Sequence, residues 1–119
     1  MGLDIDFYHV KPVSMRSFRK YYFLAAYFEN LNGGADINGC LITVDNVTAV
    51  DLYDRCQKVM AHHGMARECF PESENFAPEY NSVFFGQVDD VAHFIESVLF
   101  PRFASEVDED NKIMVDVNF

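Results

Sequence analysis

Residues 3–9 read Leu-Asp-Ile-Asp-Phe-Tyr-His, with an apolar side chain at every second position up to Phe7. This period of two is typical of a β-strand that buries one face and exposes the other. The chain closes on a similar alternation over residues 113–119, Ile-Met-Val-Asp-Val-Asn-Phe. We therefore predict a strand at each end of the chain, and we expect the last strand to pair beside the first.

Apolar residues recur at helical spacing from Met15 to Ala25, and Ser14 is placed to cap them. We predict a helix over about residues 15–29, which the glycine pair at 33–34 follows with a chain reversal. The side of this helix opposite the apolar stripe carries three basic residues, Arg16, Arg19 and Lys20. They are candidates for binding an anion, or they form a solvated face or pair with acids elsewhere in the chain.

Two short apolar runs, residues 41–44 and 83–85, predict further strands. A helical stripe predicts a helix over about 47–63, with Asp45 or Asn46 as its cap and Gly64 as a left-handed residue after its end.

A third helix is predicted to begin at Asp89 or Asp90 and to end or bend at Pro101. Residues 65–81 hold two prolines and four glutamates without an apolar period, which predicts a long exposed acidic loop. The fold class is α+β: one domain over residues 1–119, with a small mixed or antiparallel sheet of about four strands packed by three helices in two layers.

The formal charge of −10 is unevenly placed along the chain. Residues 1–67 hold seven acidic and seven basic residues, whereas residues 68–119 hold twelve acidic and two basic ones. A surface of this kind repels nucleic acid and anionic membrane and attracts cationic partners. The composition therefore favours a basic protein surface as the partner, with no direct contact to nucleic acid or membrane.

Carboxylates on a folded surface can imitate the phosphates of nucleic acid and occupy a basic groove built for it. The alternative is a solvated face that only keeps the protein soluble. The candidate partner-binding residues are Glu68, Glu72, Glu74, Glu79, Asp89, Asp90, Glu96, Glu106, Asp108, Glu109 and Asp110.

Three cysteines at uneven spacing argue against a disulfide framework and for reduced thiols. Cys56, His62, His63 and Cys69, with Cys40, form a weak candidate zinc site, because tight ligand pairs such as C-x-x-C are absent. We expect no cofactor.

No glycine-rich phosphate loop, nucleophile elbow or H-E-x-x-H motif occurs in the chain. An enzyme is therefore the minority interpretation, and its best version is a metal-dependent site using Asp4, Asp6 and His9. We expect a non-enzymatic protein.

The predicted first helix carries more aromatic residues than one face can hold. If all of them fold inward, the helix is central. Otherwise a surplus, for example Tyr21 and Phe28, offers a contact surface for a homodimer. A structural homo-oligomer is thus a further alternative.

The opening Met1-Gly2-Leu3-Asp4, the aromatic pair Phe7-Tyr8, and the Phe84-Phe85-Gly86 segment before Asp89-Asp90 resemble a family of short bacterial and phage proteins of unknown function. The resemblance implies a phage or mobile-element context and a shared fold. The expected function is a cytoplasmic inhibitor that blocks the nucleic-acid groove of a host protein, such as a CRISPR effector or another defence nuclease.

Overall fold

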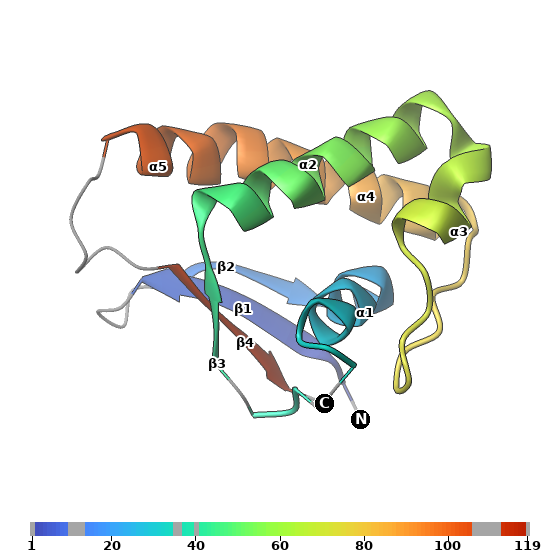
Figure 1. The fold of residues 1–119 in the computed structure, drawn as a ribbon, viewed down its shortest axis with the longest axis horizontal. Coiled ribbons are helices and arrows are strands. Elements are labelled where there is room, and N and C mark those ends of the chain that lie inside the picture. The colour runs from blue at the N-terminus through green and yellow to red at the C-terminus, as the bar shows by residue number, and fades with distance from the viewer. Residues whose placement is uncertain (1, 10–13, 35–36, 40, 106–112, 119) are drawn as a thin grey trace.

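The computed structural model describes residues 2–9, 14–34, 37–39, 41–105 and 113–118. It is an α+β fold in which helices cover one face of a four-stranded antiparallel sheet (Figure 1). The elements in chain order are β1 (Asp4–His9), β2 (Ser14–Arg19), α1 (Tyr22–Leu31), β3 (Leu41–Val44), α2 (Asn46–Ala61), a 3-10 turn (His63–Met65), α3 (Ala66–Cys69), α4 (Ser82–Phe94), a π-helical segment (Ile95–Leu99), α5 (Phe100–Ser105) and β4 (Ile113–Asn118). The predicted fold class is confirmed.

The sheet has the strand order β2-β1-β4-β3, so the two terminal strands pair at its centre as predicted. Ile5 of β1 lies between Phe18 of β2 and Val117 of β4. All three side chains are buried, whereas their neighbours along the strands point to the other face. The alternation in the sequence therefore sets which face of the sheet meets the helices.

Residues 14–19 form β2, and the prediction of a helix there is wrong. The spacing of Met15 and Phe18 suits a helix, but pairing with β1 buries Phe18 against the rings of Phe7 and Phe94, at 5.7 and 5.3 Å between centroids. The helix begins only at Tyr22. The basic residues Arg16 and Arg19 consequently lie on an edge strand, and Lys20 follows it.

Residues 83–85 are also helical, not a strand. Asn81 caps α4 by accepting a hydrogen bond from Phe84 N at 3.1 Å, so the predicted caps Asp89 and Asp90 lie inside the helix. Val83 and Gly86 are exposed while Phe84 is buried, which is the pattern of a helix that buries one face. A run of three apolar residues carries too little periodicity to reveal this.

The segment predicted as a long exposed loop, residues 65–81, is partly helical and partly buried. It includes α3, and Phe70, Phe76 and Pro78 are buried. The helix α2 was predicted with nearly correct bounds and is capped by Asp45, whose side chain accepts from Thr48 N at 2.8 Å. Gly64 is part of the 3-10 turn and does not adopt the expected left-handed conformation.

The helical chain continues through Pro101 to Ser105, so the proline does not end it. A π-helical segment lies directly before α5. Because proline lacks an N–H group, a wider turn at this point accommodates the missing hydrogen bond. The prediction that Pro101 ends or bends this helix thus anticipated an irregularity, but not its form.

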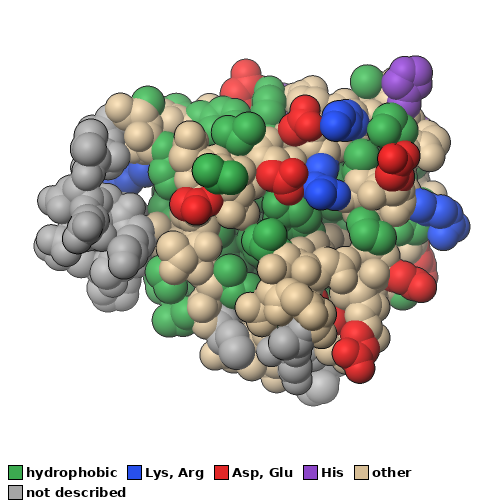
Figure 2. Space-filling view, viewed as in Figure 1, with side chains coloured by type: hydrophobic (Ala, Val, Ile, Leu, Met, Phe, Trp, Pro, Cys, Tyr) green, Lys and Arg blue, Asp and Glu red, His purple; other side chains and the backbone are tan. Residues whose placement is uncertain are grey.

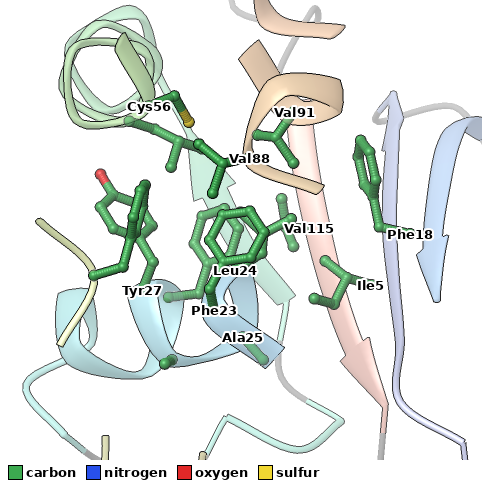
Figure 3. Close-up of a cluster of buried hydrophobic side chains, with 14 of the residues drawn as sticks. Ile5, Phe18, Phe23, Leu24, Ala25, Tyr27, Cys56, Val88, Val91 and Val115 are labelled. Atoms are coloured by element: carbon green, nitrogen blue, oxygen red, sulfur yellow. The ribbon is translucent and has the colours of Figure 1, made fainter. Parts of the chain in front are cut away.

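The helix α1 lies at the centre of the molecule. Side chains from α1, α2, α4 and the sheet meet around it, including Leu24, Tyr27, Cys56, Val88 and Val115 (Figure 3). Each residue from Phe23 to Glu29 is buried. The described residues include no helix that is both long and apolar enough to cross a membrane.

Candidate functional site: a fixed acidic segment

Residues 68–79, which we call the acidic segment, run from α3 toward α4 and lie beside α1 (Figure 1). Their position depends on Glu29, the one charged side chain among the described residues that is fully buried. Its carboxylate accepts hydrogen bonds from Asn75 N at 2.8 Å and from Asn75 Nδ2 at 3.0 Å. A buried carboxylate needs such donors, so α1 and the acidic segment hold each other in place.

Further contacts fix both ends of the acidic segment. Tyr80 Oη donates to Phe70 O at 2.8 Å, which closes the ends of the loop on each other. The ring of Phe70 packs against Phe23 of α1 at 5.0 Å, and Ser73 N donates to Phe76 O at 2.9 Å. The backbone is therefore held by side chains that point inward, and its acidic side chains are left to face solvent.

The four acids of this segment, Glu68, Glu72, Glu74 and Glu79, are exposed. In the described part of the chain none of them forms an ion pair. Glu79 accepts a hydrogen bond at 3.5 Å from its neighbour Asn81. These four carboxylates keep their charge available to a partner.

The acids predicted on the third helix are used differently. Asp90 pairs with Arg16 at 2.7 Å and accepts a hydrogen bond from Tyr21 Oη at 2.6 Å. Burial, and then the bond to Asp90, raise the pKa of Tyr21 to about 12. Asp90 therefore stabilises the contact between β2, the start of α1 and α4, and it is a poor candidate for binding a partner.

Asp89 and Glu96 are exposed but also have neighbours. Asp89 lies 3.5 Å from His93 Nδ1, and its backbone carbonyl and its charge raise the pKa of that histidine. Glu96 accepts a hydrogen bond from Tyr53 Oη at 3.3 Å. Glu106, Asp108, Glu109 and Asp110 lie outside the described residues.

The described candidate acids lie on two parts of the chain, the acidic segment and the stretch from α4 into the π-helical segment. The acids of the acidic segment share one stretch of the chain, are exposed, and form no ion pair with the described residues.

The candidate zinc site has no ligand set among the described residues, which contain no group of three His, Cys, Asp or Glu able to hold a metal. Cys56 and Cys69 are buried, and burial raises the pKa of Cys56 to about 12. His62 and His63 are exposed, and His63 stacks on Phe85 at 3.8 Å. Cys40 lies outside the described residues.

The candidate metal-dependent active site also lacks a ligand set among the described residues. Asp4 and Asp6 lie on the face of the sheet away from the helices, where Asp6 is opposite Asp116 of β4. Two like charges opposite each other repel, and the described residues supply no third ligand. The side chain of His9 lies outside the described residues.

The proposed aromatic surplus on α1 is mostly buried. Phe28 is fully buried against Phe7, so the prediction that it forms part of a contact surface is wrong. Tyr21 is partly buried and donates a hydrogen bond to Asp90. Tyr22, with 43% of its surface exposed, is the aromatic residue of α1 that reaches solvent.

Sequence reasoning missed the residues that position the acidic segment, namely Glu29, Asn75 and Tyr80. The sequence held one signal. Glu29 is a charged residue that directly follows the apolar and aromatic run from Tyr21 to Phe28. Its partner lies 46 residues away, which no local pattern shows.

We compared the chain with protein-family models, curated proteins and solved structures, and none of them matches.

Proposed function

We propose that this protein is a non-enzymatic binding protein that docks the acidic segment against a basic groove of a nucleic-acid-binding protein. The observation that carries the proposal is that this segment combines a fixed backbone with unpaired acidic side chains. Its backbone is held by buried contacts, whereas Glu68, Glu72, Glu74 and Glu79 are exposed and lack ion pairs among the described residues.

A fixed backbone favours binding because less conformational entropy is lost when the partner arrives. Unpaired carboxylates increase the rate of association with a cationic surface and displace the anions bound there, as phosphates do. A solvated face needs no such fixation, since mobile acids keep a protein soluble equally well.

The finer version of the proposal is an inhibitor encoded by a phage or mobile element, acting on a defence nuclease such as a CRISPR effector. It draws on the resemblance of the opening residues Met1 to Asp4 and on the excess of acid after residue 67. Blocking the entry of nucleic acid requires no catalytic group on the inhibitor.

A pull-down from host lysate tests the proposal. The native protein is compared with a variant in which Glu68, Glu72, Glu74 and Glu79 are changed to Gln. The matched control carries the same change in charge at four carboxylates outside the segment: Asp4→Asn, Asp54→Asn, Asp89→Asn and Glu96→Gln. We expect a nucleic-acid-binding protein to be recovered with the native protein and the control, and to be lost with the segment variant and at high salt.

Added duplex DNA provides a second arm, because it should compete for the same groove. Equal recovery with the segment variant, or recovery that DNA leaves unchanged, would contradict the proposal. Equal loss with both variants would show that net charge acts without a defined site.

A further inference from the structure

A cavity of about 890 Å³ opens between the start of β1, the end of β2, the start of α1 and the segment leading into α4. Its apolar lining includes the exposed Tyr22 and Val83 and, beneath them, buried side chains such as Phe23 and Phe84. Its cationic lining is Arg19 and Lys20. This volume falls within the range of roughly 300–1,000 Å³ typical of small-ligand sites, which combine an apolar body with few polar groups.

The two cations at this cavity differ from three others among the described residues, which form ion pairs. Arg16, Arg55 and Lys58 each form an ion pair, at 2.7, 3.0 and 3.1 Å. Arg19 and Lys20 form none with the residues that the structure describes, in a protein that has 19 acidic residues. One carboxylate, that of Glu79, lines the cavity with them. The cavity is therefore a locally cationic site in an acidic protein.

Lys20 adopts a left-handed conformation with a φ of 63°, and it is the one non-glycine residue with positive φ among those described. Its N–H donates to Leu3 O at 2.7 Å, which holds the backbone in this turn between β2 and α1. Glycine would fit such a turn without strain. A lysine here is more easily explained by its side chain than by its backbone, since strained residues often serve a site.

The neighbouring helix end adds to the positive potential. No side chain caps the N-terminus of α1 within the described chain, and its first residues Tyr22 and Phe23 line the cavity. Uncapped N–H groups at a helix start favour a negative charge nearby. The side chain of Arg19 lies over the start of β1, where a methyl group built on Gly2 would be 3.5 Å from Arg19 Nη2.

We propose that this cavity binds an organic carboxylate with an apolar or aromatic body. The carboxylate lies between Arg19 and Lys20, and the apolar body lies against the exposed side chains of Tyr22 and Val83 that line the cavity. A polyanion is disfavoured because Glu79 lines the cavity and the protein carries a net charge of −10. The carboxylate can belong to a free small molecule or to the C-terminal residue of a polypeptide. This inference does not depend on the proposed function of the acidic segment.

The test uses the full chain and the fluorescent anion anilinonaphthalene sulfonate as the probe. Competitors are 4-phenylbutanoate and its neutral analogue 4-phenylbutanol, and a short peptide ending in Phe with a free or an amidated terminus. We expect 4-phenylbutanoate or the free-acid peptide to displace the probe at least tenfold better than its neutral counterpart, because a charge-assisted hydrogen bond is worth about a factor of ten or more. The stronger of the two acids identifies the source.

Variants locate the binding. Lys20→Gln and Arg19→Gln are each expected to weaken carboxylate binding roughly tenfold, whereas Lys58→Gln, an equal change of charge outside the cavity, leaves it unchanged. Ala77 is exposed and lines the cavity, so Ala77→Trp should block binding without disturbing the core.

Lys20→Gly separates binding from folding. It removes the cation and relieves the left-handed strain, so we expect a higher Tm together with weaker binding. Equal displacement by the acid and the neutral analogue, or binding that survives both Arg19→Gln and Lys20→Gln, would overturn the proposal. A failed pull-down with the acidic segment would leave this result untouched, because Glu68, Glu72 and Glu74 do not line the cavity and Glu79, which does, is unchanged in every variant of this test.

Discussion

Carboxylates in the α2–α4 layer and carboxylates of the acidic segment have opposite surroundings. In the layer, the Asp51 carboxylate accepts hydrogen bonds from Tyr27 Oη at 2.8 Å and from Arg55 Nε at 3.0 Å. The Asp90 carboxylate accepts hydrogen bonds from Tyr21 and Arg16. Acidic and basic side chains accordingly lie side by side where α2 crosses the upper part of the molecule (Figure 2). In the acidic segment the four glutamates have no such ion-pair partners among the described residues.

The difference shows that acid content alone does not identify a binding surface. Paired acids contribute to the fold, and unpaired acids on a fixed backbone remain free to act on a partner. The acidic segment is held in place by the carboxylate of Glu29, which belongs to α1 and not to the segment. Three classes of variant test this division, and their expected effects on stability decrease in the order given.

The largest effect is expected at Glu29. Glu29→Ala leaves the N–H and the amide of Asn75 without their acceptor and opens a cavity at the end of α1, so it should lower the free energy of unfolding by about 3 kcal/mol. Urea unfolding measures the loss, and hydrogen exchange should show faster exchange in residues 70–81 than elsewhere. Glu29→Gln keeps the shape and should lose less.

A loss below about 1 kcal/mol with Glu29→Ala, or exchange that is unchanged in the acidic segment, would show that other contacts fix it. Tyr80→Phe is the matched comparison, because it removes a single hydrogen bond to Phe70 O from the same segment.

The parts of the fold that were predicted correctly are those where local pattern and tertiary environment agree. The two terminal strands alternate because one face meets the helices, and α2 shows both a cap and an apolar stripe. The errors at residues 14–19 and 83–85 occur where a short apolar run fits two periods. Pairing with β1 decided the first case, and the cap at Asn81 with burial of Phe84 decided the second.

The candidate site was predictable only as a list of acids. Their positions in the sequence do not show that Asp90 is occupied by Arg16 and Tyr21, because those partners lie 74 and 69 residues away. The cavity beside Lys20 likewise depends on four separate segments meeting. Such sites follow from the tertiary fold, which had to be known first.

The intermediate effect on stability is expected for the hydrogen bond of Tyr21, and it shows at alkaline pH. The pKa of Tyr21 is raised from 10.0 to about 12 by burial and by its bond to Asp90. A raised pKa in the folded state means that stability is fully present below pH 10 and is lost as pH rises toward 12. Burial raises the pKa of Tyr27 and Cys56 as well. We therefore expect the urea concentration at the unfolding midpoint to decrease as the pH is raised from 9 to 11.

The variant Tyr21→Phe should lower stability at pH 7 by about 1 kcal/mol and make the fall at alkaline pH shallower. Tyr22→Phe is the control, because the Tyr22 side chain is exposed and the described residues give its hydroxyl no partner. An alkaline limb that is identical in the native protein and in Tyr21→Phe would count against a role for the bond to Asp90.

The smallest effect on stability is expected in the acidic segment itself. Glu72→Gln and Glu74→Gln remove charges that form no ion pair with the described residues, so each should change the free energy of unfolding by less than about 0.5 kcal/mol. At low salt the sign should be stabilising, because each change reduces the self-repulsion of a chain with a net charge of −10. Asp51→Asn is the paired counterpart and should cost about 1 kcal/mol, since it weakens bonds to Tyr27 and Arg55. Equal losses at Glu72, Glu74 and Asp51 in urea unfolding would remove the distinction between paired and unpaired acids on which the proposed binding surface depends.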